Sequence, residues 1–320
     1  MSATDDWLAA LLKQPEADVA DLEPVTRAEA SHRLALLGVP DADLDDVLAT
    51  LPGPDRTPGL WEALLRCHQV LYAREPIPSR LVDWPNAPAE LGTAGRYFYV
   101  HLYLLALPTL LALHEELRIP FDVTEATVRD LGAKVVTYRK YYDVGGFDRQ
   151  GWLVRHFRGT LFRLGKLQFD RAVLTVDEYK AGPDTGPEDG TPVLEVHIPG
   201  DGPMTPQACA ESFRRARPFF LEHFPEEHYE YGTCRSWLLD PQLAGVLPES
   251  SNIVRFQPLW TLFGPMPDCD SDVLEFVFHL PPGTGDLAAL PQDTTLQRVL
   301  VSHLRSGGHW RQGCGWLALP

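Results

Sequence analysis

A histidine at the end of a predicted strand is the residue of this chain best suited to proton transfer. Residues 193–198, VLEVHI, predict a strand that carries His197 near its end. The unperturbed pKa of histidine is about 6.5, so His197 is a candidate general base near neutral pH. A Gly/Pro-rich turn then leads to a helix that Thr205 caps, and the backbone N–H groups at such a helix start can hold an anion. The alternative is that Asp201 and the glycines only make a turn.

A second candidate is the polar strand predicted at Tyr229–Leu238. Strict alternation places Tyr231 and Arg235 on one face and Cys234 on the other. A strand covered on both faces is normally apolar, so this one either lies at a sheet edge or lines a site. Cys234 could then be a nucleophile, a proton donor or a small buried side chain, and the last is the commonest role of a lone cysteine.

Two further segments carry groups that suit an anionic ligand. The loop after the polar strand leads into a helix predicted at Ser250–Trp260 and capped by Ser250 or Ser251, where free N–H groups, Asn252 and Arg255 converge. An ordinary capped surface helix explains the same pattern. Residues 155–166, RHFRGTLFRLGK, are the most basic run of the chain, and they fit either a phosphorylated ligand or a solvated helix face.

Composition and missing motifs exclude several classes of protein. The 320 residues carry a net charge of −16, which argues against a general nucleic-acid binder. Dinucleotide, P-loop, zinc-protease and nucleophile-elbow motifs are absent. The five cysteines are widely spaced and contain no CxxC pair, which argues against a structural zinc site and against a disulfide framework. No metal site is predicted.

The sequence also bears on where the protein is located. The acidic N-terminus does not resemble a signal peptide. Tyr97–Leu113 is too short and too interrupted to span a membrane comfortably, so we expect a buried helix in a cytoplasmic protein without a membrane partner.

The order of predicted elements divides the chain into two halves. Helical periodicity dominates as far as Phe162, including single helices at Thr124–Tyr141 and Phe147–Phe162. From Leu167 onwards the pattern changes to β-β-α-β-α-β-α-β. The predicted strands are Leu167–Val176, Val193–Ile198, Tyr229–Leu238, Val273–His279 and Trp310–Leu319. We therefore expect an α+β protein with an all-helical domain at residues 1–163 and a mixed α/β domain at residues 164–320.

Three stretches carry a resemblance to a known family: RGTLFRLGKLQF, VHIPGDGPMTP and CRSWLLDPQLAGVLPESSNIVRFQ. They resemble a group of two-domain bacterial acyltransferases, in which a helical N-terminal domain precedes a domain similar to the GNAT superfamily of acyl-coenzyme A N-acyltransferases. GNAT enzymes bind the coenzyme A pyrophosphate on a [Q/R]xxGx[G/A] loop. Residues 242–247 match it up to Leu247, which replaces the small last residue.

The resemblance implies transfer of an acyl group from acyl-coenzyme A to an amine of a small molecule, with acyl-coenzyme A as co-substrate and no tightly bound cofactor. In that scheme His197 is the base and Cys234, with Tyr231 as second choice, protonates the leaving thiolate. The pyrophosphate-binding candidates are Ser250, Ser251, Asn252 and Arg255. Two alternatives remain open: a hydrolase with Cys234 as nucleophile and His197 as its base, and a non-catalytic protein that binds a small ligand.

Overall fold

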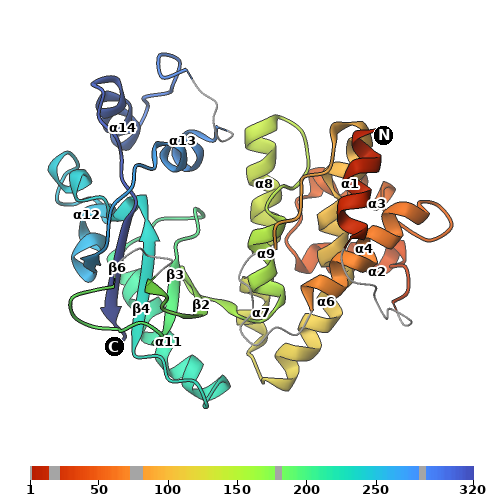
Figure 1. The fold of residues 1–320 in the computed structure, drawn as a ribbon, viewed down its shortest axis with the longest axis horizontal. Coiled ribbons are helices and arrows are strands. Elements are labelled where there is room, and N and C mark those ends of the chain that lie inside the picture. Colours follow the sequence, from red (N-terminus) through yellow and green to blue (C-terminus); the bar gives the residue numbers. More distant parts are fainter. Residues whose placement is uncertain (1, 14–21, 73–81, 177–181, 281–285) are drawn as a thin grey trace. The chain divides into compact units, whose positions relative to one another are not determined.

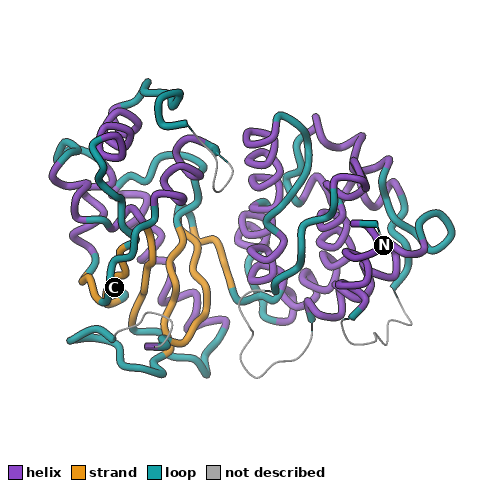
Figure 2. Tube along the Cα trace, turned by 45° about the horizontal axis from the view of Figure 1, so that its top comes forward, coloured by secondary structure: helices purple, strands orange, loops and turns teal. Residues whose placement is uncertain are grey.

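A computed structural model describes residues 2–13, 22–72, 82–176, 182–280 and 286–320 of the chain. It divides into two compact units, residues 1–162 and 163–320 (Figure 1). The described strands all lie between residues 161 and 318, and the residues before them form helices and loops (Figure 2). The helical first part and the mixed sheet of the second confirm the predicted α+β class.

The first unit is built from short helices around one long apolar helix. Its helices are α1 (Ala3–Leu12), α2 (Arg27–Leu36), α3 (Asp41–Ala49), α4 (Pro58–Leu71), η1 (Ala89–Leu91), α5 (Gly92–Arg96), α6 (Phe98–Glu116), α7 (Phe121–Val128), α8 (Asp130–Tyr142) and α9 (Gln150–Phe157). A capping box stands at the start of α2, where the Thr26 hydroxyl accepts from the Glu29 N–H and the Glu29 side chain accepts from the Thr26 N–H. Three prolines predict a loop at Ile77–Glu90; residues 82–88 are a loop, and residues 77–81 lie outside the described residues.

Helix α6 forms the core of this unit. Tyr97, Phe98, Tyr99 and Tyr103 are all buried, so this aromatic group packs the interior of the helical unit. The helical stretch at residues 89–116 is apolar enough to cross a membrane by length and composition, but 72% of its most apolar window is buried inside the protein. The burial is that of a core helix, as predicted.

The helix predicted at Thr124–Tyr141 is wrong in one respect, because it is two helices. Helix α7 ends at Val128 and α8 begins at Asp130, on either side of Arg129. The break lets α8 approach the turn after α2, where the Gly132 N–H donates to the Leu37 carbonyl at 3.0 Å. A Cβ atom at Gly132 would lie 1.9 Å from the Gly38 oxygen, so this contact requires glycine.

The second unit is a mixed sheet with helices. Its elements are β1 (Leu161–Leu164), β2 (Leu167–Val173), β3 (Pro192–His197), α11 (Pro206–His223), β4 (Tyr231–Ser236), η2 (Trp237–Leu239), η3 (Pro241–Gly245), α12 (Asn252–Phe256), η4 (Gln257–Leu259), β5 (Thr261–Phe263), α13 (Asp270–Phe278), α14 (Thr295–Arg305) and β6 (Gly313–Ala318). The six strands follow the order β1-β2-β3-β4-β6-β5. Strands β2 and β3 form an antiparallel pair, β3 and β4 are parallel, and β6 runs antiparallel to both β4 and β5.

Helix α11 covers one face of this sheet. It starts as predicted, with Thr205 capping the Ala208 N–H and Pro206 in the first position. Phe213 of α11 meets Phe169 of β2 edge to face at 5.9 Å between ring centroids. The face that carries Phe169 is therefore apolar and closed by a helix, and the chemistry of the sheet must be sought on the other face.

Three predicted elements of the chain differ in the structure. Val273–His279 is not a strand but most of helix α13, whose buried Val273 and Phe278 belong to a cluster shared with α14. The helix predicted to run to Phe162 ends at Phe157, and the next residues form β1. The helix predicted at Ser250–Trp260 is the short α12, and residues 257–259 continue it only as a 3-10 turn.

Candidate functional site

The candidate site lies where the two parallel strands stop pairing. Strands β3 and β4 are matched at three positions, the last being Glu195 opposite Thr233. Beyond it, β3 runs on to His197 beside β2, and β4 runs on to Ser236 beside β6. The carboxyl ends of parallel strands joined by a crossover helix are where open α/β sheets bind ligands. Helix α11 is that crossover, and His197 stands at this end.

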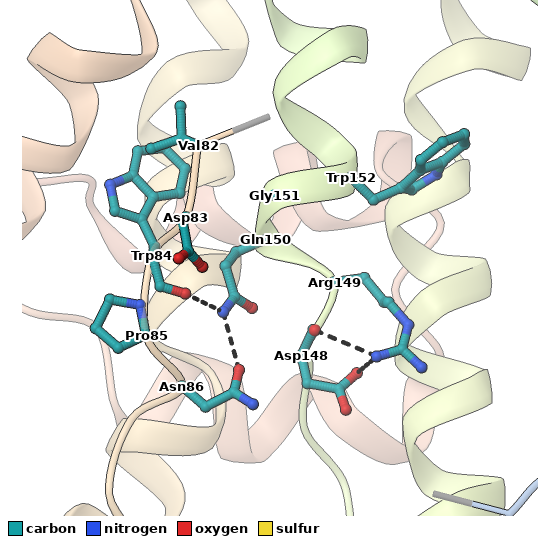
Figure 3. A pocket seen from close by; sticks show the side chains of 10 residues that line it. All are labelled: Val82, Asp83, Trp84, Pro85, Asn86, Asp148, Arg149, Gln150, Gly151 and Trp152. Atoms are coloured by element: carbon teal, nitrogen blue, oxygen red, sulfur yellow. Dashed lines mark hydrogen bonds and ion pairs between the residues drawn. The ribbon is translucent and has the colours of Figure 1, made fainter. Parts of the chain in front are cut away.

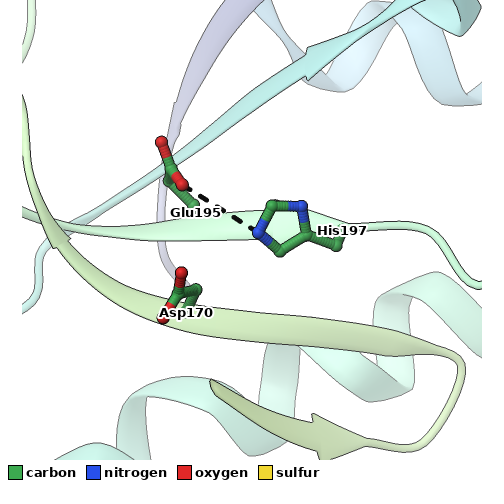
Figure 4. A group of neighbouring side chains, drawn as sticks. All are labelled: Asp170, Glu195 and His197. Atoms are coloured by element: carbon green, nitrogen blue, oxygen red, sulfur yellow. Dashed lines mark ion pairs between the residues drawn. The ribbon is translucent and has the colours of Figure 1, made fainter. Parts of the chain in front are cut away.

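His197 shares its sheet face with two acidic side chains. Glu195 precedes it by two residues on β3, and Asp170 of β2 is the direct cross-strand partner of Glu195. The ligand-type atoms of Asp170, Glu195 and His197 lie within 4.8 Å of one another (Figure 4). The His197 Nε2 is 3.9 Å from Glu195 Oε2, which is an ion-pair distance when the ring is protonated. Asp170 is 1% exposed, so this carboxylate is held inside the protein.

This arrangement favours a positive charge on the group placed among the carboxylates. Two acidic side chains this close repel each other where water is largely excluded, and a cation between them removes that cost. An imidazolium at His197 is such a cation. One histidine and two carboxylates are also a donor set that divalent metals accept, so the same three residues could hold a metal ion.

Cys234 lies on the other face of the sheet. Its cross-strand partner on β6 is Gly315, and the Cβ position of Gly315 points at Trp260, which contacts Phe213 of α11. Burial raises the pKa of the Cys234 thiol, with smaller contributions from Cys314 and Glu195. The structure therefore does not bring Cys234 together with His197, and a hydrolase that used the two as nucleophile and base would lack the required contact.

Tyr231 shares the face of His197 but is far from it along the strand. Tyr231 is paired with Val193, four residues before His197, which at about 3.3 Å per residue is a separation of roughly 13 Å. Its ring packs edge to face against Trp316 at 5.6 Å. Tyr231 and Trp316 belong to the apolar part of this face, so the structure gives Tyr231 a packing contact at the far end from His197.

The predicted pyrophosphate residues lie at the start of α12. Ser251 caps the helix, and its hydroxyl accepts from the Ile253 N–H at 3.3 Å. Ser250 and Arg255 are exposed and Asn252 is half-buried. The sequence brings these four residues together, but α12 has only five residues, so its dipole is small.

The turn between His197 and α11 is held in place by two basic side chains. Lys166 Nζ donates to the carbonyl oxygens of Pro199 at 2.5 Å, Asp201 at 2.8 Å and Gly202 at 3.0 Å. Arg163 adds a bidentate ion pair to Asp201, with contacts of 2.7 and 3.0 Å. The turn predicted from the glycines and Asp201 is therefore confirmed. Its contacts hold the chain in place between His197 and α11, a helix of 18 residues.

Sequence-family comparison divides the chain as the structure does. Residues 28–159 match the N-acyltransferase N-terminal domain, and residues 161–317 match the GNAT-like C-terminal domain. Together the two matches cover most of the chain.

The protein belongs to the GNAT-like acyltransferases.

Solved structures of acyltransferases resemble the whole of this chain. An acyltransferase variant in complex with octanoyl-CoA is 37% identical, with a TM-score of 0.87, and the match covers 100% of this chain and 96% of that one. An acyltransferase in complex with decanoyl-CoA and teicoplanin is 38% identical with a TM-score of 0.86 and the same coverage. A third, in complex with CoA and 10C-teicoplanin, matches equally well. No protein with a curated function matches the sequence.

The candidate site of this GNAT-like acyltransferase contains two residues that the sequence analysis does not single out, Asp170 and Glu195. A signal is present in the sequence, because LQFDRAV and VLEVH each place one acidic residue between apolar residues of a predicted strand. A carboxylate in a buried strand is rare unless it is paired. Membership of an enzyme family also removes the prediction of a non-catalytic ligand-binding protein.

Proposed function

We propose that this acyltransferase moves an acyl group from acyl-coenzyme A to an amine of a small molecule, with His197 as the general base. The observation that carries the proposal is the position of His197: it lies beside Glu195 and Asp170, at the end of β3 where the parallel strands separate. The GNAT-like family and the acyl-CoA complexes of the relatives support the donor.

The proposed reaction is a direct displacement. The amine nitrogen attacks the thioester carbonyl, a C–N bond forms, the C–S bond breaks, and coenzyme A leaves as a thiolate. The proton that nitrogen loses goes to the imidazole of His197, and the imidazolium can return it to the thiolate. Glu195 and Asp170 stabilise the imidazolium by Coulomb attraction while the proton resides there. No second acid is needed, which fits the placement of Cys234 and Tyr231 away from His197.

Two places are proposed for the coenzyme A pyrophosphate. The first is the start of α12, with Ser250, Ser251, Asn252 and Arg255. The second is the N-terminus of α11, which follows His197 directly and is the start of the crossover helix. Arg255 distinguishes them, because it belongs only to the first. If α12 holds the phosphates, we expect Arg255→Ala to weaken acyl-CoA binding in calorimetry. If α11 holds them, Arg255→Ala should bind acyl-CoA as tightly as the control variant Arg217→Ala, which changes an exposed residue of α11.

Teicoplanin, or a compound of its kind, is the acceptor that we propose to carry this amine. Two relatives were solved with teicoplanin or an acylated teicoplanin, and both are 38% identical to this chain over its full length. Teicoplanin is therefore a suitable first acceptor, beside simple primary amines.

The test is an acyl-transfer assay on the full chain with octanoyl- and decanoyl-CoA, followed by mass spectrometry of the acceptor and by thiol release. We expect an N-acylated product from the wild type and a loss of about 10²- to 10⁴-fold in rate for His197→Ala, the usual contribution of a general base. His228→Ala, an exposed histidine of the same unit, is the matched control. Equal turnover by the two variants would remove His197 as the base. Thiol release without an acylated acceptor would indicate hydrolysis instead.

A further inference from the structure

One residue of the polar strand β4, Arg235, has no part in the proposed proton transfer. Strands β3 and β4 pair in parallel as far as Glu195 and Thr233. Beyond that pair, β3 runs on beside β2 to His197 (Figure 4), and β4 runs on beside β6 to Arg235. Both residues lie two positions past the last pair, so they stand on opposite sides of the gap that opens between the two strands.

Arg235 lies on the same face of the sheet as His197. Its cross-strand partner on β6 is Cys314, which belongs with Trp316 to the apolar cluster of that face. Arg235 is exposed, so a ligand in the gap has access to its guanidinium group. Paired strands are about 4.8 Å apart. An arginine side chain is longer than this spacing, so Arg235 can reach a group that lies between the diverging strands.

The charges on this face are arranged as a dipole across the gap. Asp170 and Glu195 place two carboxylates on the side of His197. Strands β2 to β6 contain two Lys or Arg residues, Arg171 and Arg235. Arg171 directly follows Asp170 in β2, so alternation places it on the opposite face. Arg235 is therefore the cation that these strands present on the face of His197.

The proposed displacement creates a negative charge that such a cation stabilises. When the amine nitrogen attacks, the π electrons of the carbonyl bond move to the thioester oxygen, and when the C–S bond breaks, the charge leaves on sulfur. The two carboxylates repel this charge, whereas a guanidinium on the other side of the gap attracts it. Donors fixed where charge develops are usually the largest single contribution to catalysis.

A cavity in the helical unit is a poorer place for this charge. It measures about 500 Å³ and lies between residues 82–86 and residues 148–152 (Figure 3). The arginine of its lining, Arg149, is paired with Asp148 at 3.2 Å, and Asp83 adds a further acidic group. The lining is therefore negative in sum, which opposes the formation of an oxyanion there.

We propose that Arg235 is a second catalytic residue, which donates hydrogen bonds to the thioester oxygen and stabilises the negative charge that forms on it. Arg235 transfers no proton, so the proton of the amine still goes to His197. Proton acceptance on one side of the gap and charge stabilisation on the other then serve the two ends of the same displacement. The role of Arg235 rests on the proposed function, since it requires acyl-coenzyme A to bind beside His197.

The test compares two acyl donors that share the thioester, because octanoyl-CoA carries the phosphates and octanoyl-pantetheine lacks them. We expect Arg235→Gln to lower kcat/KM about 10²-fold with either donor, the loss typical of one missing oxyanion donor. With octanoyl-CoA the loss should lie in kcat, with KM little changed, because the charge forms only in the transition state. Arg217→Gln, an exposed arginine of α11, is the control and should keep the wild-type kcat.

Other roles of Arg235 give different results. A loss with octanoyl-CoA that is absent with octanoyl-pantetheine would mean that Arg235 binds a phosphate. A change confined to the KM of the amine acceptor would place Arg235 at the acceptor. Either result, or a kcat equal to that of Arg217→Gln, would overturn the assignment. A wild-type protein that acylates no amine with either donor would instead refute the proposed function itself.

A conservative variant separates charge from structure. Arg235→Lys keeps a positive charge but loses the fork geometry of the guanidinium, so we expect it to recover about tenfold of the kcat that Arg235→Gln loses. Thermal unfolding should show the same stability for both variants and for the wild type, because Arg235 is exposed. Equal kcat values for the Lys and Gln variants at unchanged stability would show that the positive charge has no role in turnover, and would refute the proposal.

Discussion

His197 owes its proposed role to the two carboxylates beside it. Imidazole is the side chain that can accept a proton near neutral pH, which suits a general base. What Glu195 and Asp170 add is stabilisation of the charged ring after it has taken the proton, at a position where Asp170 is screened from water. They act through His197, so they are positioning residues and not catalytic ones.

The first prediction concerns this electrostatic support. Glu195→Gln removes one negative charge next to the imidazole, so the imidazolium is less stable and His197 titrates at lower pH. We expect kcat/KM at neutral pH to fall about 10- to 100-fold, within the usual range of a general-base contribution, and the acidic limb of its pH profile to move to lower pH. Glu230→Gln, an exposed residue next to β4, is the matched control. A fall in rate with an unmoved pH profile would mean that Glu195 is only structural.

The second prediction concerns metal at the same three side chains. Because we assign His197 to proton transfer, we expect dialysis against EDTA to leave the rate of acyl transfer unchanged and elemental analysis to find no stoichiometric metal. If EDTA abolished activity and Mn²⁺ or Zn²⁺ restored it, Asp170, Glu195 and His197 would be the metal ligands. Among the described residues, they form the group whose donor atoms lie close enough to bind one ion. His197 could not then serve as the base.

The third prediction concerns Cys234. Its side chain lies on the face covered by α11, and burial keeps its thiol protonated by raising its pKa. We expect Cys234→Ala to retain the acyl-transfer rate within about threefold while losing some stability, because truncating a buried side chain leaves a small cavity. Steady-state kinetics and a urea unfolding curve on the same preparation measure the two effects separately. Loss of turnover at unchanged stability would restore Cys234 as the thiolate's proton donor.

At the scale of elements, close contacts depend on single glycines. Gly132 near the start of α8 touches the backbone at Gly38, where a Cβ would lie 1.9 Å from the oxygen. We expect Gly132→Ala to destabilise the protein by about 2 kcal/mol, because overpacking outweighs the gain of roughly 1 kcal/mol in helix propensity. Gly245→Ala is the control, since no atom lies within 4 Å of the added Cβ. Denaturant unfolding that ranked the two variants equally would contradict this account of the α7–α8 break.

The wrongly predicted elements are segments whose secondary structure depends on the residues that pack against them. Residues 273–279, VLEFVFH, are rich in strand-forming side chains, and local preference alone favours a strand. In the protein, Asp270 and Asp272 lie in the first turn of a helix, and Val273, Leu274, Val277 and Phe278 follow helical spacing against the α14 cluster. The sequence contains this helical spacing, and the two aspartates before it are a local signal for the start of a helix. The strands β1 and β5 are only four and three residues long, too short for a period to be recognised.

At the scale of the whole molecule, the strand order places one of the predicted residues, His197, at the end of β3 beyond its pairing with β4. His197 could be found because a strand, a turn and a capped helix follow one another in the sequence, and that succession is local. The separation of Cys234 from His197 and the approach of Asp170 to Glu195 depend on which strands pair and in what register. Register is set by non-local contacts, so no local pattern could have given it.

Three buried histidines make the helical unit sensitive to acid. Burial lowers the pKa of His68 to about 4, of His101 to about 3 and of His114 to about 4. In the unfolded chain they titrate near 6.5, so below that pH the unfolded state binds more protons and stability falls. Each histidine then costs up to about 1.4 kcal/mol per pH unit until its folded-state pKa is reached.

We therefore expect the stability of the helical unit to be fully present above about pH 7 and to be lost between about pH 6 and pH 4. Urea unfolding of the full chain at several pH values, with hydrogen exchange resolved by peptide and corrected for intrinsic rates, measures this for each unit. His101→Gln should reduce the pH slope of residues 1–162, whereas the control His32→Gln should not, because His32 is exposed on α2. A slope that His101→Gln leaves unchanged would show that acid acts on this unit through other groups.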